Sequence, residues 1–207
     1  MLLPRFYPIL DASCFPGASA MFAAEELAAA GCTFLQYRNK SGNAREMVAH
    51  ARELKGRVGR QLKLIMNDRP DVCLAADFDG VHVGQDDLSP ESVRRIIGTE
   101  FRHKPRLLGV STHNPEQLAE ADKTSADYLA IGPIFATSSK ANPDPVVGLD
   151  GLRRARALTR KPLVAIGGIT RANARSVIES GADSVAVISD LLPDPGKSAE
   201  EFLRVLG

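Results

Sequence analysis

The sequence contains little cysteine. Cys14, Cys32 and Cys73 are its only cysteines, and no two of them form a CxxC pair. An odd number of widely spaced cysteines argues against a disulfide scaffold and against a cysteine-based zinc site. The composition favours a reducing compartment, so we expect a cytoplasmic protein.

The sequence also lacks an excess of charge of either sign and a long apolar run. Its 26 Lys and Arg residues and 25 Asp and Glu residues leave a net charge of +1. No overall field therefore attracts nucleic acid or an anionic membrane, and any anion site must be local. The first residues lack a basic start followed by an apolar stretch, and no apolar run is long enough to span a membrane. We expect neither export nor membrane insertion.

Short apolar runs recur along the chain between segments of helical periodicity. Most are nearly continuous, as is typical of parallel strands buried on both faces. The predicted strands are Phe6–Asp11, Phe34–Asn39, Leu62–Asp68, Gly80–Gly84, Arg106–Thr112, Tyr128–Pro133, Leu163–Gly168 and Ser184–Asp190. Eight strands alternating with helices predict an α/β fold of the (β/α)₈ TIM-barrel type, with residues 1–207 forming a single domain.

Helix signals and a weak internal repeat support this alternation. Capping side chains precede predicted helices at Asn43, Ser89, Asn114 and Thr170, and Gly98 and Gly181 stand where helices should end. Asp79, Asp127 and Asp183 each come directly before a strand. A doubly wound open sheet is the rival architecture, but no GxGxxG motif follows the first strand. We therefore favour the barrel, and look for function at the carboxyl ends of its strands.

Basic and acidic side chains gather at the predicted strand ends. Gln36, Arg38 and Lys40 share one face of the second strand, because side chains alternate along a strand. An amide, a guanidinium and an ammonium projecting together suit a phosphorylated ring compound. The alternative is that the two cations are solvated loop charges. Asp68 and Asp87 follow the third and fourth strands and predict a Mg²⁺ site, with helix capping as the alternative.

A second group of residues follows the last three strands. Gly167 and Gly168 allow close backbone approach at the end of strand seven, where barrels commonly bind phosphate, although a tight turn explains them equally well. The segment 136–147 is either a lid that becomes ordered or a solvated loop. His82 and His113 are not assigned as general bases, because structural roles explain them as well.

In order and spacing, these motifs resemble the thiamine-phosphate synthase family over almost the whole chain. The matching pieces are Gln36-x-Arg38-x-Lys40, Asn67-Asp68, the run from Asp79 to Asp87, Gly109-Val-Ser111-Thr-His113, Gly132 to Lys140, Ala165 to Gly168, and Ile188-Ser189. The resemblance implies that a hydroxymethylpyrimidine diphosphate loses pyrophosphate and that the nitrogen of a thiazole phosphate takes its place, giving thiamine phosphate.

The resemblance also implies residue roles. Gln36, Arg38, Lys40, Asn67, Ser111 and Lys140 would bind the pyrimidine diphosphate, and Asp68 and Asp87 would carry Mg²⁺. Thr137, Ser139, Gly168, Ile188 and Ser189 would hold the thiazole phosphate. Lys140, Ser111, Arg38 and Lys40 would be catalytic, acting on a dissociative reaction that needs no protein nucleophile.

Two other functions compete with this interpretation. A thiazole tautomerase shares the fold, but its pattern has a histidine after the glycine at which this chain has Gly132 followed by Pro133. A barrel that only binds phosphorylated ligands is the other, and the retained Asp68 and Asp87 argue against it, because carboxylates weaken anion binding unless a cation accompanies them. The expected partners are small phosphorylated pyrimidine and thiazole substrates; a homo-oligomer is compatible with the sequence, which leaves the oligomeric state open.

Overall fold

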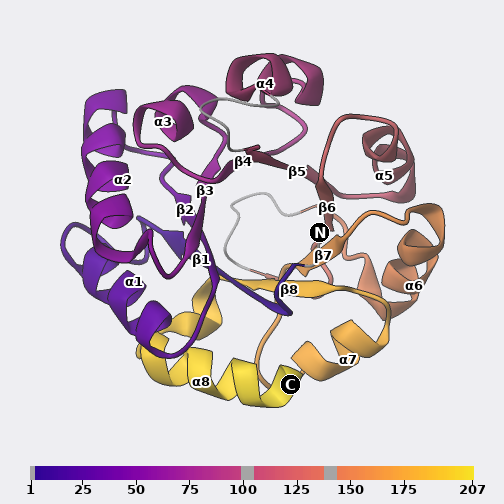
Figure 1. Ribbon diagram of the computed structural model, residues 1–207. Coiled ribbons are helices and arrows are strands. Elements are labelled where there is room, and N and C mark those ends of the chain that lie inside the picture. The colour runs from indigo at the N-terminus through magenta and orange to yellow at the C-terminus, as the bar shows by residue number, and fades with distance from the viewer. Residues whose placement is uncertain (1–2, 99–104, 138–143) are drawn as a thin grey trace.

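The computed structural model describes residues 3–98, 105–137 and 144–207. Eight parallel strands form a closed barrel in chain order, and the predicted TIM-barrel fold is confirmed (Figure 1). The strands are β1 (Phe6–Asp11), β2 (Phe34–Arg38), β3 (Lys63–Asn67), β4 (Gly80–Val83), β5 (Leu107–Thr112), β6 (Tyr128–Ile131), β7 (Leu163–Ile166) and β8 (Ser184–Val187).

Helices surround the barrel in Figure 1 and cover the outer face of the sheet. They are α1 (Ser19–Ala29), α2 (Ala44–Val58), α3 (Pro70–Ala75), α4 (Pro90–Ile97), α5 (Pro115–Asp122), α6 (Gly148–Leu158), α7 (Ala174–Glu179) and α8 (Pro195–Leu206), with a 3₁₀ turn, η1 (Ser189–Leu191), after β8. No helix in the described part of the chain is long and apolar enough to cross a membrane.

Three of the four predicted N-caps are confirmed and one is wrong. The side chains of Asn43, Ser89 and Asn114 accept backbone N–H groups in the first turns of α2, α4 and α5. Thr170 does not cap α7, which begins after Asn173. Instead, the Asn173 side chain accepts the Thr170 N–H at 2.8 Å, so an additional turn separates β7 from its helix.

The aspartates that precede three strands have a common structural role. Asp79 accepts the backbone N–H of Leu64 on β3 at 2.9 Å. Asp127 accepts from Leu108 at 2.7 Å and Asp183 from Leu163 at 2.8 Å. Each carboxylate also forms a salt bridge to a basic residue on the helix before the neighbouring strand. The pairs are Asp79 with Lys55, Asp127 with Arg94, and Asp183 with Arg156. The internal repeat therefore satisfies backbone donors where strands begin, opposite the end that carries the site.

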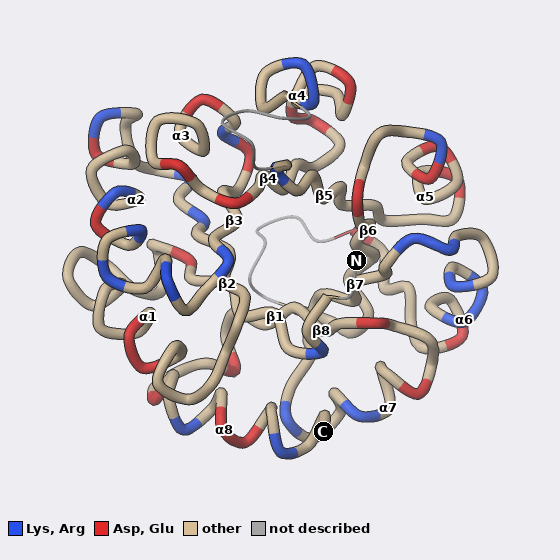
Figure 2. Tube along the Cα trace, viewed as in Figure 1, with Lys and Arg blue, Asp and Glu red and all other residues tan. Residues whose placement is uncertain are grey.

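Two apolar layers position the site. One lies between strands and helices, and the other fills the barrel interior with side chains that include Tyr7, Phe34, Ile65, Tyr128 and Val164. The interior is thus a packed core, as TIM barrels require, and functional groups are expected above it at the carboxyl ends of the strands. Charges of both signs are mixed over the helices in Figure 2, in keeping with the small net charge.

Candidate active site

A pocket of about 250 Å³ lies at the carboxyl ends of the strands, above the interior layer. Its lining includes every predicted site residue that the structure describes: Gln36, Arg38, Lys40, Asn67, Asp68, Asp87, Ser111, Thr137, Gly168, Ile188 and Ser189. Ser139 and Lys140 lie outside the described residues. Strands β3, β7 and β8 end earlier than the sequence predicts. Asp68 therefore lies just beyond β3, Gly168 beyond β7, and Ile188 and Ser189 beyond β8. The residues therefore have the backbone freedom that loops provide.

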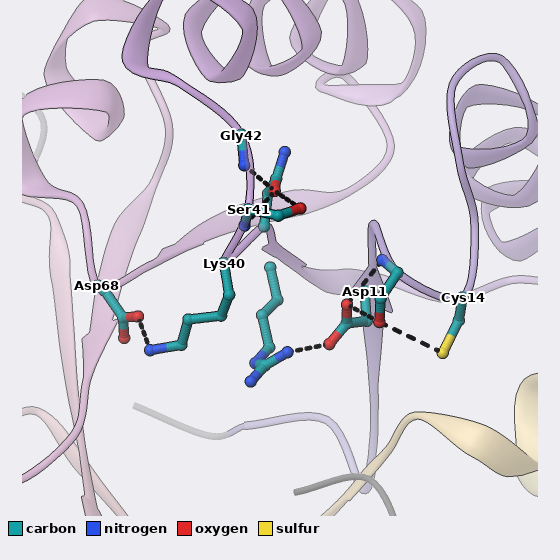
Figure 3. Close-up of polar contacts among 9 residues, drawn as sticks. Asp11, Cys14, Lys40, Ser41, Gly42 and Asp68 are labelled. Carbon is teal, nitrogen blue, oxygen red and sulfur yellow. Dashed lines mark hydrogen bonds and ion pairs between the residues drawn. The ribbon is translucent and has the colours of Figure 1, made fainter. Parts of the chain in front are cut away.

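The basic face of β2 lies against acidic residues from its neighbours. Arg38 donates to Asp11, which is 4% exposed at the end of β1. Lys40 reaches across to Asp68 after β3 (Figure 3). The sequence interpretation missed Asp11. Arg38 ends β2 and is held by its salt bridge at the pocket wall, so it is not a solvated loop charge, whereas Lys40 is paired but lies in the loop after β2 with its side chain 54% exposed.

Asp68 and Asp87 form a carboxylate pair that does not cap helices. The N-cap of α3 is Arg69 and that of α4 is Ser89, so the capping alternative is wrong for both. Asp87 accepts the Gly84 N–H at 2.8 Å. Burial, and then the neighbouring Asp68 carboxylate, raise the pKa of Asp87. Asp68 has a φ of 62°, a conformation that costs a non-glycine residue energy and that is found at functional sites.

The donor set fits Mg²⁺. Mg²⁺ is usually bound through one or two carboxylates together with substrate phosphates, so two aspartates facing the same pocket are sufficient. No cluster of three or more His, Cys, Asp or Glu side chains suited to a metal occurs in the described residues. A cation between the carboxylates would remove the repulsion that raises the pKa of Asp87. The side-chain nitrogen of buried Asn67 has no hydrogen-bond partner among the described residues and is left for a ligand acceptor.

The turn after β7 packs closely against the segment after β6. Gly167 and Gly168 have φ values of 97° and 63°. A Cβ atom at Gly168 would lie 2.5 Å from the carbonyl oxygen of Ala136, and one at Gly167 would lie 2.5 Å from Pro133. The structure therefore requires both glycines for the turn itself, and the same turn lines the pocket beside Ile188.

A chain of polar side chains lies at the bottom of the pocket. Gln36 donates to the Tyr7 hydroxyl at 3.0 Å, and Tyr7 lies 2.9 Å from the Tyr128 hydroxyl. His82 bridges Tyr128 and Ser111. Sequence reasoning left His82 unassigned and missed both tyrosines. The available signal was that all three tyrosines of the chain lie in predicted strands, and that a tyrosine hydroxyl needs a partner when it is buried.

His113 lines the pocket directly after β5. Its Nδ1 atom is 2.8 Å from the Gly132 carbonyl oxygen and 3.5 Å from Asp144. The Gly132 carbonyl fixes the orientation of the ring, which supports the structural explanation given for His113.

Comparisons of the whole chain with known proteins show its family. A family model described as thiamine monophosphate synthase matches residues 6–191. A thiamine-phosphate synthase of Koribacter versatilis is 62% identical to the chain, over 99% of this chain and 96% of the relative. The chain belongs to the thiamine monophosphate synthase family. The resemblance inferred from the motifs is thereby confirmed.

Further relatives agree with the family assignment. A thiamine-phosphate synthase of Chloroflexus aurantiacus is 44% identical over 98% of this chain and 92% of the relative. A solved thiamine phosphate pyrophosphorylase from Pyrococcus furiosus superposes with a TM-score of 0.85 at 32% identity, covering 98% of this chain and 95% of that one. These relatives thus match the chain over nearly its whole length, and the solved one has the same fold.

Proposed function

We propose that the chain is a transferase of thiamine biosynthesis. It condenses 4-amino-2-methyl-5-hydroxymethylpyrimidine diphosphate with 4-methyl-5-(2-phosphoethyl)thiazole, or its carboxylated form, to thiamine phosphate and pyrophosphate. Besides family membership, one observation carries the proposal: a single pocket brings together the cations of β2, the carboxylate pair and the glycine turn after β7. These are the groups that a diphosphate, a divalent cation and a second phosphate require.

The reaction is a dissociative substitution at the methylene carbon of the pyrimidine. The carbon–oxygen bond breaks and its electron pair leaves with pyrophosphate; the thiazole nitrogen then donates its lone pair to the electron-poor carbon. Negative charge grows on the departing oxygens, so fixed cations stabilise the transition state more than the ground state. Arg38 and Lys40 supply these cations within the described residues, and Lys140 is expected to add a third.

The carboxylates serve the same step. Asp68 and Asp87 would hold Mg²⁺, which when bound would neutralise charge on the leaving pyrophosphate. Lys40 donates to Asp68, and it could turn from that carboxylate to a phosphate oxygen once a cation is held there. Asp11 keeps Arg38 at the pocket wall, which lowers the entropy lost when the guanidinium meets the diphosphate.

The phosphate of the thiazole substrate binds at a different side of the pocket from the diphosphate. Gly168, Ile188, Ser189 and Thr137 line the side of the pocket formed after β6, β7 and β8, and Ser139 is expected to join them. No lysine or arginine lines the pocket in this part of the described chain. Backbone amides and hydroxyls suit a monophosphate, while the diphosphate takes the cations and the metal, so the two substrates are distinguished by the charge that each site offers.

The cytoplasm is the proposed compartment. Cys14, Cys32 and Cys73 are all free thiols, as a reducing environment would keep them. A homo-oligomer remains compatible with this function, since the pocket is formed by the strand ends of one chain.

Incubation of the purified protein with each precursor alone, and then with both, tests the proposed function. We expect thiamine phosphate only with both precursors and Mg²⁺, and no product when a chelator removes the metal. A barrel that only binds phosphates would form no product under any condition, and an isomerase would convert the thiazole phosphate without the pyrimidine. Either outcome would overturn the proposal.

A further inference from the structure

Five polar side chains form a continuous hydrogen-bonded chain across the barrel interior, from β2 to β5. The steps are Gln36 Nε2 to Tyr7 Oη at 3.0 Å, Tyr7 Oη to Tyr128 Oη at 2.9 Å, Tyr128 Oη to His82 Nδ1 at 3.1 Å, and His82 Nε2 to Ser111 Oγ at 2.8 Å. Both ends, Gln36 and Ser111, line the pocket. The three central residues lie almost entirely out of solvent, with Tyr128 0% exposed.

The first donor determines the direction of the whole chain. The Gln36 amide nitrogen can only donate, so the Tyr7 oxygen accepts from it. The acceptor that the described residues offer to the Tyr7 proton is then the Tyr128 oxygen. Tyr128 must in turn donate to His82 Nδ1, because the described residues offer its buried proton no other acceptor. The opposite direction would leave the Tyr7 proton buried without an acceptor, which is costly.

The protonation states of Tyr7, Tyr128 and His82 agree with this direction. Burial raises the pKa of Tyr7 and of Tyr128, so both keep the protons that they donate. The His82 nitrogen that accepts the Tyr128 proton has no proton of its own, so the ring has a single N–H. Nδ1 accepts from Tyr128, and the proton therefore resides on Nε2, from which it is donated to Ser111. The Ser111 hydroxyl, as an acceptor from His82, keeps its own proton available for the pocket.

The backbone of the barrel makes room for the central bond. Gly109 on β5 lies between the two residues, paired with His82 on β4 and with Tyr128 on β6. A Cβ atom at Gly109 would lie 2.1 Å from the Tyr128 ring and 2.4 Å from His82 Nδ1. Only glycine at this position allows the tyrosine and the histidine to meet across the strand.

We propose that Tyr7, Tyr128 and His82 are positioning residues that hold the Ser111 hydroxyl as a hydrogen-bond donor to a diphosphate oxygen of the bound pyrimidine substrate. The ligand in this statement rests on the proposed function, whereas the direction of the chain does not. The same chain holds the Gln36 amide so that its oxygen is left as an acceptor for a donor group of the ring. A donor to an oxygen on which charge grows during pyrophosphate departure acts mainly on turnover.

The tautomer of His82 is the direct test, and it needs neither substrate nor metal. Nitrogen NMR of the ¹⁵N-histidine-labelled, ligand-free protein, with the signal assigned by comparison with His82→Gln, should show the Nε2–H form in the wild type. Tyr128→Phe removes the donor to Nδ1 and should give a mixture of tautomers. Tyr37→Phe is the matched control, because it also removes a buried tyrosine hydroxyl but packs in the outer layer of the barrel. It should leave the His82 signal unchanged.

Kinetics of the same variants complete the test. Tyr128→Phe should lower kcat roughly tenfold, the loss of about one hydrogen bond, while the KM for thiazole phosphate stays constant. Tyr7→Phe should act in the same direction with a smaller loss, and it serves if Tyr128→Phe does not fold. His82→Gln should recover part of the activity lost in His82→Ala, because its amide can still donate to Ser111.

Two results would overturn the proposal. An Nδ1–H tautomer in the wild type would mean that the chain runs from Ser111 to Gln36 and that the serine proton is turned away from the ligand. Equal kcat values for wild type, Tyr128→Phe and Tyr7→Phe would mean that the chain does not position the serine. A wild type with the Nε2–H tautomer but no synthase activity would support the direction of the chain and count against the proposed function instead.

Discussion

Replacement of Gly168 by alanine tests how tightly the turn after β7 is held against the segment after β6. Gly168 has a φ of 63°, and the added Cβ would lie 2.5 Å from the Ala136 carbonyl oxygen and 2.8 Å from the Phe135 Cβ. The substitution therefore has two costs. One is the left-handed backbone conformation of a residue with a side chain, and the other is the close approach to a neighbouring backbone.

The two costs have separate magnitudes. The left-handed conformation costs an L-residue about 1–2 kcal/mol. Inserting a methyl group into a packed position typically costs a further ~1–3 kcal/mol, because backbone atoms must move. We therefore expect Gly168→Ala to lower the free energy of unfolding by about 2–5 kcal/mol. A loss of this size is a large fraction of the stability of an ordinary domain.

Gly17 provides the matched control. Its φ is 58°, but a Cβ atom there would meet nothing within 4 Å. Gly17→Ala should therefore cost only the conformational part, about 1–2 kcal/mol. Urea unfolding of both variants and the wild type gives the difference between them, which isolates the contact with Ala136. Equal losses for the two variants would refute the close approach, and with it the explanation of why the phosphate-side turn requires a second glycine.

Three further predictions concern the pocket and the barrel interior beneath it. Folding raises the pKa of Asp87, so ionising this carboxyl lowers the free energy of unfolding. This loss of stability is absent below the unfolded pKa of about 3.9, where Asp87 is protonated in both states, and it is complete once the pH has risen through the folded pKa. In metal-free buffer Asp87→Asn should therefore gain stability relative to the wild type as the pH rises above that range, by less than about 1 kcal/mol because solvent and Lys40 screen the pair; a difference that does not vary with pH in urea titrations would contradict this. The same variant should lose most of the rise in melting temperature that Mg²⁺ gives the wild type, and an equal rise in differential scanning fluorimetry would place the metal elsewhere. Gly109→Ala should lower the free energy of unfolding by roughly 2–4 kcal/mol, because the methyl group overpacks the barrel and separates Tyr128 from His82; an unchanged urea midpoint would show that the strands can move apart freely.

The fold could be predicted from the sequence because local signals and the global pattern agree. Buried parallel strands give continuous apolar runs, and caps such as Asn43 and Asn114 mark where helices begin. The errors lie at strand ends, where the backbone leaves the sheet before the apolar pattern does. Ile188 is apolar and yet lies beyond β8, and Thr170 precedes a turn that Asn173 stabilises.

The site could be predicted in its membership but not in its internal contacts. Position at a strand end follows from the alternation of strands and helices, which explains why Gln36, Arg38, Asp68 and Asp87 were found. Contacts between strands depend on register, which a single sequence does not show. The Arg38–Asp11 salt bridge and the meeting of Tyr7 with Tyr128 were missed for this reason. The approach of Gly168 to Ala136 depends in the same way on how two loops pack.

The rate of thiamine phosphate formation in Arg38→Gln tests most directly whether this pocket performs the condensation. The variant removes the charge but keeps a donor for Asp11, and exposed Arg57, which pairs with Glu25 and Glu53 on the surface, supplies the matched control Arg57→Gln. With both precursors and Mg²⁺ saturating, we expect equimolar thiamine phosphate and pyrophosphate from the wild type. We also expect a loss of roughly a hundredfold or more in Arg38→Gln and a rate within about twofold of wild type in Arg57→Gln. A folded Arg38→Gln that forms thiamine phosphate at the wild-type rate would contradict it.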